Sequence, residues 1–403
     1  HFWPDWTQVL GLSIDYLSPT LYLTDILVMV ILGVWLWDNI GNLRLQISNL
    51  KTKSQILKLM LPLSIFPFLL VNFLLAQNFS VAIYKLVKII EFTLLGFYVA
   101  KNNYIPSTVR HPLSLAVIYS SLIAMIQFLK QGSIGGLFWW LGERTFSLMT
   151  PGIAKAIING CLVMRPYATF SHPNVLAGFV LVSLILMATR NQETGVRRFL
   201  YWAALVLGGI AIAISFSRSA WLVGVMVGLI VISRHLRFTT LRGCPNGLLR
   251  GGIVLLVALI SFGLFFFLSR GLSGQEAIGH RLALAQVAIE MIRTNPLAGV
   301  GLNNFISQLP NYWQQFGTTY WLQPVHNIFL LVAAETGLTG LMIFLWFLIL
   351  TYKRLLATGH WPLVTALSAI LVLGLFDHYW LTLQQPQLLL TIIFGLSWAK
   401  RGV

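Results

Sequence analysis

Charged residues are scarce in this chain: they make up 9% of its 403 residues, whereas 57% are hydrophobic. A soluble domain carries about 25% charged residues, so the composition excludes an ordinary soluble protein. Apolar runs of about 20 residues, the length that crosses the hydrocarbon core of a bilayer, recur along the whole sequence. We therefore expect an all-α, polytopic membrane protein that forms a single integral membrane domain over residues 1–403.

Acidic residues and cysteines are also few, with 11 Asp and Glu residues and 2 cysteines. Cys161 and Cys244 fall in different connections between apolar runs, and no Cys/His spacing typical of a metal site is present. The connections expected on the outer face contain no DxD-like acidic pair, which argues against a metal-bridged diphosphate substrate. We therefore expect no disulfide between the two cysteines, no metal and no cofactor.

Lys and Arg outnumber the acidic residues and give the chain a net charge of +16. This excess does not indicate nucleic-acid binding, because it is concentrated in the short connections between apolar runs. If successive connections alternate between the two faces, about two thirds of the Lys and Arg residues gather on one face, which the positive-inside rule assigns to the cytoplasm. Residues 1–20 then lie outside, and a cytoplasmic start would need one more helix before residue 1.

The apolar runs predict about eleven spans, each near the length needed to cross a bilayer. Two long connections between them fall on the outer face, at 131–171 and 269–325, and connections of this length are more often functional than idle. The second is the main outer loop and contains an amphipathic helical stretch that Pro296 ends. The predicted spans are 21–38, 56–76, 79–100, 112–130, 172–190, 199–216, 219–234, 251–268, 327–351, 361–379 and 386–399.

Three arginines and one histidine are expected near the outer face. His326 precedes the ninth span, Arg218 lies in a short outer turn, Arg281 lies on the amphipathic stretch and Arg165 ends the first long loop. Guanidinium groups bind phosphate oxygens as planar forks, and histidine can accept a proton from a hydroxyl near neutral pH. Together these groups are suited to transfer from a diphosphate-linked donor. The alternative is an interfacial anchor for each arginine and a cap at a helix start for His326.

Two further sets of polar residues are candidates for substrate binding. Asn327 is one, although an asparagine at a helix start more often bonds the backbone. Lys85, Lys88 and Glu91 recur at i, i+3 spacing inside the third span, where ionisable groups should face the protein interior or a wet cavity. Two interpretations stay open: a Lys88–Glu91 pair with Lys85 extended outward, or a cationic wall for an anionic lipid headgroup.

Glu335 is the only acidic residue of the ninth span. It follows His326 by nine positions, about 180° round a helix, so it is not expected to orient the imidazole, and a pairing with another helix is favoured. The small residues around it, such as Ala334 and Gly337, predict close helix packing.

Four stretches in this order, SHPNVLAGF, SFSRSAWL, GHRLALAQVAIEMIRTNPLAGVGLNNF and HNIFLLVAAETGLTGL, resemble the O-antigen ligase and O-antigen polymerase superfamily. The resemblance covers about residues 165–345, whereas the N-terminal third is similar only in having apolar spans. It implies a multi-pass glycosyltransferase of the bacterial inner membrane with its active site facing the periplasm. Such an enzyme moves a glycan from undecaprenyl diphosphate to a sugar hydroxyl, without a metal and with inversion. Its partners would be the lipid-linked donor, a glycan or lipid-anchored acceptor, and membrane lipids.

The same resemblance implies roles for individual residues. His326 matches the essential histidine of the family, Arg218 and Arg281 match its arginines, and Arg165 stands where relatives often carry a basic residue. Ligases and polymerases share these motifs, but the modest size and the single dominant outer loop favour a ligase that uses a lipid A-core sugar. A polymerase that joins lipid-linked repeats is the alternative, and a protein or other surface acceptor is also open.

An anion transporter, for example one for bicarbonate, is the alternative from another class of function. A transporter places charged or broken-helix features near the middle of the membrane, with access from both sides. The candidate groups in this sequence gather at one face, and only Lys85, Lys88 and Glu91 are expected deeper. We therefore favour an enzyme.

Overall fold

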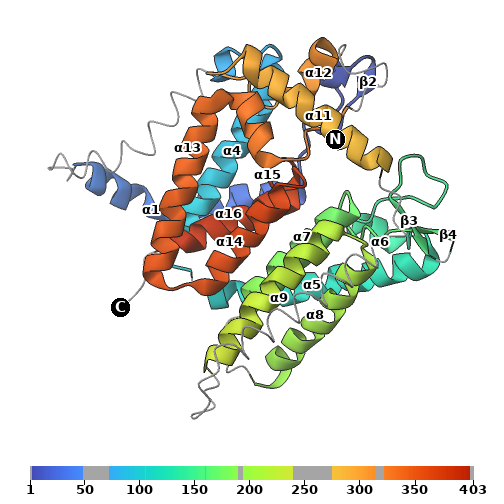
Figure 1. Ribbon diagram of the computed structural model, residues 1–403. Helices are drawn as coiled ribbons and strands as arrows, with labels where there is room; N and C mark the ends of the chain where they lie inside the picture. The colour runs from blue at the N-terminus through green and yellow to red at the C-terminus, as the bar shows by residue number, and fades with distance from the viewer. Residues whose placement is uncertain are drawn as a thin grey trace. The chain divides into compact units, whose positions relative to one another are not determined.

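The computed structural model describes residues 2–48, 72–104, 106–158, 160–188, 194–238, 275–313 and 322–399. The chain divides into two compact units, and helices dominate both of them, as the all-α prediction requires (Figure 1). Two predicted spans, 56–76 and 251–268, lie mostly or wholly outside the described residues. The first unit comprises His1–Tyr104, Ile278–Gly359 and Asp377–Val403, and the second comprises Ile105–Ala277 and His360–Phe376.

The first unit is built around α4, which packs against α16 and α1. A second core lies under α11 and α12, where Leu284, Met291, Phe305 and Trp313 are buried together. The buried positions of α11 recur every three or four residues, so one face of this helix is apolar. The elements are η1 (Asp5–Thr7), β1 (Gln8–Val9), β2 (Leu12–Ser13), α1 (Leu23–Ser48), α4 (Phe79–Lys101), α11 (Gln275–Thr294), α12 (Phe305–Trp313), α13 (Ile328–Thr358), α15 (Tyr379–Thr382) and α16 (Gln384–Trp398).

The second unit is a helix bundle with α7 at its centre, since α7 packs against α5, α8, α9 and α14 and is buried along most of its length. An antiparallel hairpin pairs Lys155 with Met164 and Ile158 with Cys161. The elements are α5 (Pro106–Lys130), α6 (Leu137–Trp140), β3 (Lys155–Ile158), β4 (Cys161–Met164), α7 (Pro173–Met187), α8 (Gly195–Ile214), α9 (Arg218–Phe238) and α14 (Trp361–Gly374).

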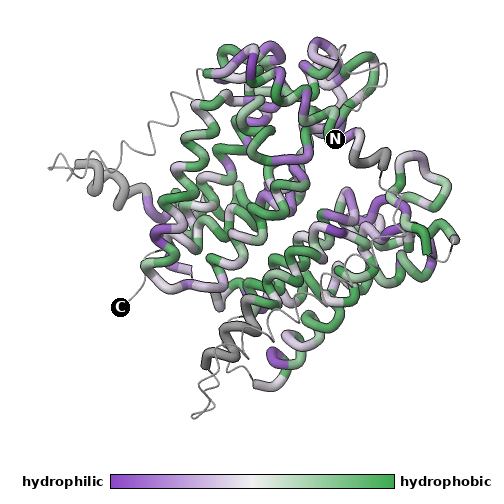
Figure 2. The backbone as a smooth tube through the Cα atoms, in the orientation of Figure 1, coloured by the Kyte–Doolittle hydropathy of each residue, from purple (hydrophilic) through white to green (hydrophobic). Residues whose placement is uncertain are grey.

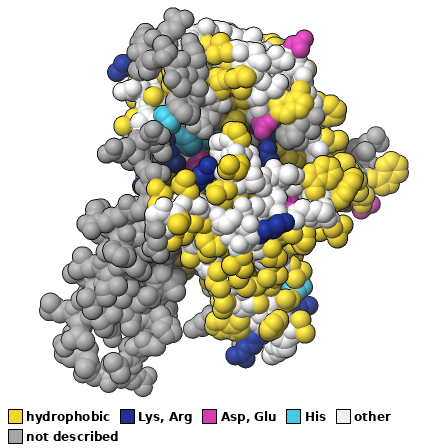
Figure 3. Space-filling view, turned by 90° about the vertical axis from the view of Figure 1, so that its right-hand side faces the viewer, with side chains coloured by type: hydrophobic (Ala, Val, Ile, Leu, Met, Phe, Trp, Pro, Cys, Tyr) yellow, Lys and Arg dark blue, Asp and Glu magenta, His cyan; other side chains and the backbone are white. Residues whose placement is uncertain are grey.

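Three helices of the described chain are long and apolar enough to cross a membrane: Ser107–Lys130, Gly195–Ile214 and Ile328–Thr358. Shorter apolar helices stand at other predicted spans, so the membrane class is supported but the count of about eleven spans is not confirmed. Figure 2 shows hydrophobic residues along the helices and hydrophilic ones mainly at their ends. Apolar side chains also cover much of the face in Figure 3, as expected of surfaces in contact with lipid.

The predicted span 327–351 is not one continuous helix. Gly337 has φ 70° and ψ 179°, a non-helical conformation that kinks α13. The part after the kink, Leu338–Thr358, has a length of about 30 Å, which matches the hydrocarbon core by itself. The short part before the kink carries His326 at its start, so the histidine and the membrane-length helix are separated by a break that the apolar pattern did not reveal.

The connection between α11 and α12 packs into this break in α13. Asn72, which is fully buried, joins the two segments, because its Nδ2 donates to the Ala298 carbonyl of the connection at 2.6 Å and to the Glu335 carbonyl of α13 at 2.9 Å. The small residues of α13 therefore pack against a loop, where helix packing was predicted. Three backbone bonds close the break: Val300 N–H to Ala334 O at 2.9 Å, Gly301 N–H to Glu335 O at 3.0 Å, and Leu338 N–H to Pro296 O at 2.8 Å.

Candidate functional site

His326 lies directly before α13 and is fixed from both sides. The next residue, Asn327, is the N-cap, and its Oδ1 accepts hydrogen bonds from Phe329 N–H at 2.9 Å and Leu330 N–H at 3.0 Å. The preceding Val325 is buried in the core under α11 and α12. The side chain of His326 itself retains 16% exposure. Asn327 thus has the capping geometry expected of an asparagine at a helix start, and the imidazole is held at a defined place.

The imidazole of His326 faces a carboxylate. Its Nδ1 lies 3.3 Å from Oδ1 of Asp377, a residue in the turn between α14 and α15. The same oxygen accepts the backbone N–H of His378 at 2.9 Å, which holds the carboxylate in place. Because Nδ1 faces an acceptor, the neutral ring carries its proton there, and Nε2 is left to accept a proton from another group.

His378 borders this pair but has a different chemical state. Its ring centroid is 5.2 Å from that of His326 and 5.3 Å from that of Tyr16, and its Nδ1 lies 2.8 Å from the Thr382 hydroxyl. Burial lowers the pKa of His378 to about 3, an effect that the nearby Asp377 opposes but does not cancel. His378 is therefore neutral at physiological pH and adds no positive charge to the site.

Arg281, on α11, belongs to the same cluster as the histidines. Burial alone would raise the pKa of the Asp377 carboxyl, but the hydrogen bond with His326 and the positive charge of the nearby Arg281 hold it well below its usual range. Asp377 is therefore ionised at physiological pH. The first unit thus brings together His326 and Arg281, two of the three predicted catalytic residues, around a carboxylate that the sequence analysis had not singled out.

The three side chains of His326, Asp377 and His378 also have the composition of a metal-ligand set. One potential ligand atom from each lies within 4.8 Å of the others, and imidazole with carboxylate is a common ligand combination. The sequence shows no metal-type spacing for this set, because His326 precedes Asp377 by 51 residues.

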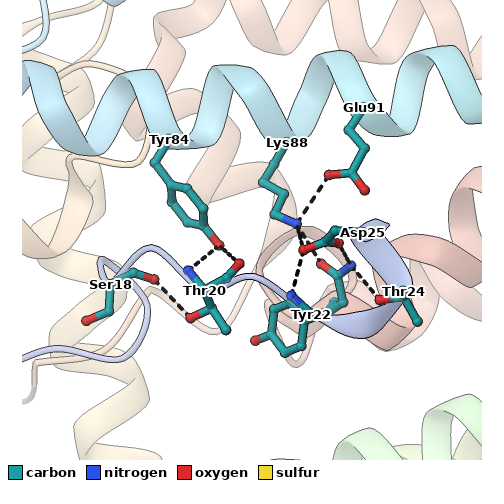
Figure 4. Close-up of polar contacts among 9 residues, drawn as sticks. Ser18, Thr20, Tyr22, Thr24, Asp25, Tyr84, Lys88 and Glu91 are labelled. Atoms are coloured by element: carbon teal, nitrogen blue, oxygen red, sulfur yellow. Dashed lines mark hydrogen bonds and ion pairs between the residues drawn. The ribbon is translucent and has the colours of Figure 1, made fainter. Parts of the chain in front are cut away.

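Lys88 forms a buried ion-pair cluster deeper in the first unit. Its Nζ lies 2.5 Å from Asp25 Oδ2 and 3.2 Å from Glu91 Oε2, and Figure 4 shows the lysine pointing between the two carboxylates. Gln384 of α16 also donates to Asp25. The cluster therefore links α1, α4 and α16. One interpretation of the sequence proposed the Lys88–Glu91 pair, and the structure contains it. That interpretation did not include Asp25.

Lys85, one turn before Lys88, has a separate environment. Its Nζ donates to the Leu381 carbonyl at the end of α15, so the side chain turns toward the protein and does not extend outward. Its charge also acts on His378. Lys85 thus lies closer to the histidine cluster than Lys88, and these two lysines do not form one wall.

Arg165 and Arg218 both belong to the second unit. Arg165 donates from Nε to the Ser215 carbonyl and from Nη2 to Asn174 Oδ1, both at 2.7 Å. Ser215 is the C-cap of α8, and Arg218 begins α9 three residues later. Arg165 therefore holds the start of the turn that carries Arg218. Arg165 was predicted to bind substrate, whereas this geometry suits a residue that positions Arg218.

Asp377 is the residue that the sequence-based prediction missed. It was placed inside the predicted span 361–379, whereas α14 ends at Gly374 and Asp377 lies beyond it. The sequence did contain a signal for a functional site here. Placing an aspartate and a histidine side by side in an apolar stretch is energetically unfavourable, so such residues commonly have a function. No local pattern, however, indicates which histidine the aspartate meets.

Comparisons with known proteins cover part of this site. The family model described as O-antigen ligase matches residues 203–345, a range that contains Arg218, Arg281 and His326. A general O-oligosaccharyltransferase of Acinetobacter baylyi (strain ATCC 33305 / BD413 / ADP1) is 24% identical over 298 residues, which cover 68% of this chain and 48% of the relative. The chain thus spans about half the length of this curated relative. Together these matches confirm the resemblance to the O-antigen ligase superfamily, which the family model locates in residues 203–345.

Proposed function

We propose that the protein is a ligase-like glycosyltransferase of the bacterial inner membrane. It moves a glycan from undecaprenyl diphosphate to a hydroxyl of a lipid A-core sugar or similar surface glycan on the periplasmic side. The family match supports the reaction class. The observation that carries the proposal is the contact between His326 Nδ1 and Asp377 Oδ1, because it leaves Nε2 as a base beside Arg281.

In the proposed reaction, Nε2 of His326 takes the proton of the acceptor hydroxyl while that oxygen attacks the anomeric carbon. The bond between this carbon and the diphosphate oxygen breaks, and undecaprenyl diphosphate leaves with the bonding electrons. A single displacement of this kind inverts the anomeric centre. Asp377 stabilises the imidazolium that forms, in the way that a carboxylate orients and supports a catalytic histidine in other enzymes.

The leaving diphosphate gains negative charge in this step, and arginine is the residue type best suited to neutralise it. Arg281 lies beside the His326–Asp377 pair and is proposed to bind the diphosphate. Arg218 belongs to the second unit and stays a predicted ligand of the diphosphate, and Arg165 holds its turn. Asn327 and Lys85 are proposed to border the bound substrate, whereas the ion pairs of Lys88 favour a supporting role for that residue.

A reconstituted transfer assay tests this function. The purified protein in liposomes receives a labelled undecaprenyl-diphosphate glycan with either lipid A-core or a second lipid-linked repeat as acceptor. We expect labelled lipid A-core together with released undecaprenyl diphosphate. Chain extension of the lipid-linked repeat alone would identify a polymerase instead.

The kink in α13 favours the transporter alternative, because interrupted helices form the binding sites of many transporters. The same liposomes therefore serve to measure bicarbonate uptake without any lipid-linked sugar. Uptake in the absence of glycan transfer would overturn the enzymatic proposal.

Removal of divalent metal is expected to leave glycan transfer unchanged, because in the proposed reaction arginines neutralise the diphosphate and the histidine acts as a free base. The measurement is the rate of transfer before and after dialysis against EDTA. A loss of activity that zinc or manganese restores would instead assign His326, Asp377 and His378 to a metal centre.

A further inference from the structure

The loop after α5 presents an exposed apolar tip, formed by Leu137–Leu141. Leu137, Trp139, Trp140 and Leu141 are 71, 55, 78 and 50% exposed, and the five-residue tip contains no charged side chain. Exposed aromatic residues at this density require a partner surface, since contact with water is unfavourable for them. This feature lies in the second unit and has no part in the function proposed above.

The tip folds back along a helix that is itself a candidate membrane span. The hydroxyl of Tyr119 on α5 donates to the Leu141 carbonyl at 2.9 Å. Tyr119 precedes Lys130, the end of α5, by eleven residues, which is about 16 Å along the helix axis. If Lys130 lies at the membrane surface, as its charge requires, Leu141 lies well inside the hydrocarbon core, whose thickness is about 30 Å.

The neighbouring surface of α5 is apolar as well. Its exposed large side chains recur at intervals of three and four residues, so they form one stripe on the helix that includes Tyr119. The tip therefore continues a surface that faces lipid. The residues of the stripe are Leu115, Tyr119, Leu122, Ile126 and Leu129.

Several backbone groups of the tip are bonded within the protein, as a position within lipid requires. The Leu141 carbonyl is bonded to Tyr119, and amides within α6 and directly after it have backbone acceptors. Phe138 and Trp139 N–H donate to the carbonyls of the two turn glycines before α6, and Leu141, Gly142 and Glu143 N–H donate back into α6.

A buried carboxylate holds the tip in place. Glu143 is 3% exposed and accepts hydrogen bonds from Gln127 Nε2 of α5 at 2.8 Å and from Ile134 N–H and Gly135 N–H at 2.6 and 2.8 Å. Gln127 also accepts from Ala168 N–H at 2.7 Å. The connection therefore has a defined structure, and these hydrogen bonds hold its apolar tip in an exposed position.

We propose that Leu137–Leu141 is a re-entrant element that inserts into the lipid bilayer beside α5. The bilayer is favoured over a protein partner because the tip is continuous with the apolar stripe of a candidate span and is bonded to that span below its end. The flanking Lys130 and Arg144 suit the headgroup level, where basic side chains extend toward water.

Spin labelling of the full chain in phospholipid liposomes tests this proposal. Cys161 and Cys244 are replaced by serine, and single cysteines are introduced by Leu137→Cys and Trp140→Cys. Both positions are exposed, so the labels do not disturb the core. The measurement is the collision rate of each label with oxygen, which concentrates in lipid, and with a nickel chelate, which stays in water. We expect the ratio of oxygen to nickel accessibility to be severalfold higher at both positions than at the control.

The matched control is a label on native Cys161, which is exposed in the hairpin of the same loop. Tyr119→Phe in the labelled variants adds a second test, because loss of the bond to the Leu141 carbonyl should move the tip toward water and lower the ratio. A ratio at positions 137 and 140 equal to that at position 161 would overturn the proposal. Low access to both reagents would also overturn it, since a protein surface would then cover the tip.

Discussion

Replacing His326 by alanine is expected to abolish measurable glycan transfer while leaving the yield of folded protein unchanged. General base catalysis contributes about 10²–10⁴-fold to a reaction rate, and alanine has no group that can accept the proton of the acceptor hydroxyl. The side chain is partly exposed and lies outside the helical core, so its removal leaves no large cavity. The measurement is the rate of transfer in liposomes, with folding checked by size-exclusion chromatography in detergent.

Two further variants separate chemistry from folding in this experiment. His111→Ala removes an exposed histidine in the second unit and should retain full activity. Asp377→Asn keeps the shape of the side chain but removes the charge that fixes the proton on Nδ1, so kcat should fall by more than KM changes. Full activity of the His326→Ala variant would remove the base from the proposed reaction. An Asp377→Asn variant with altered KM alone would contradict the orienting role of the carboxylate.

Replacing Gly337 by alanine is expected to destabilise the first unit strongly. A Cβ at this position would lie 2.3 Å from the Leu297 carbonyl carbon and oxygen and 2.7 Å from Ala298 N, atoms of backbone that cannot move aside freely. The φ of 70° with ψ of 179° is in addition a conformation that residues other than glycine rarely adopt. Strain and overpacking together should lower the free energy of unfolding by about 3 kcal/mol or more.

The unfolding temperature in detergent, followed by tryptophan fluorescence, measures this effect. The matched control is Gly33→Ala in α1, where an added Cβ meets no atom within 4 Å and the helical backbone tolerates alanine. That variant should be neutral or slightly stabilised, because alanine favours a helix by about 1 kcal/mol over glycine. Equal unfolding temperatures for the two variants would mean that the break in α13 is not a tightly packed joint.

Composition and hydropathy were sufficient to predict the class of fold, because a helix that crosses a membrane requires a long run of apolar residues. The joint at Gly337 could not be predicted in this way. Its bonding partners, Pro296 to Gly301, lie about 40 residues earlier, and the backbone amides that they use are the same in every sequence. The glycines were visible, but a glycine among small residues also fits ordinary helix packing, which is the interpretation that the sequence favoured.

The candidate site shows the same division between what local sequence reveals and what it does not. His326 could be selected because it precedes an apolar span, and Arg281 because it lies on the amphipathic stretch of the outer loop. The structure places them in one cluster. The roles of Asp377 and Asp25 depend on partners that lie 51 or more residues away in the sequence. Asp377 contacts His326, and Asp25 contacts Lys88. A single sequence carries no information on such pairings, since they depend on how the helices return to one another.

The separation between His326 and Asp377 has a consequence for biosynthesis. The segment between them includes α14, which belongs to the second unit, so the chain must leave the first unit and come back before the two side chains can meet. Contacts between distant parts of a chain form late, because the loop between them must close first. Until α14 has been made and the chain has returned to the first unit, the growing protein therefore holds an imidazole without its carboxylate. The base of the proposed reaction would then gain its partner only after α14 has been inserted.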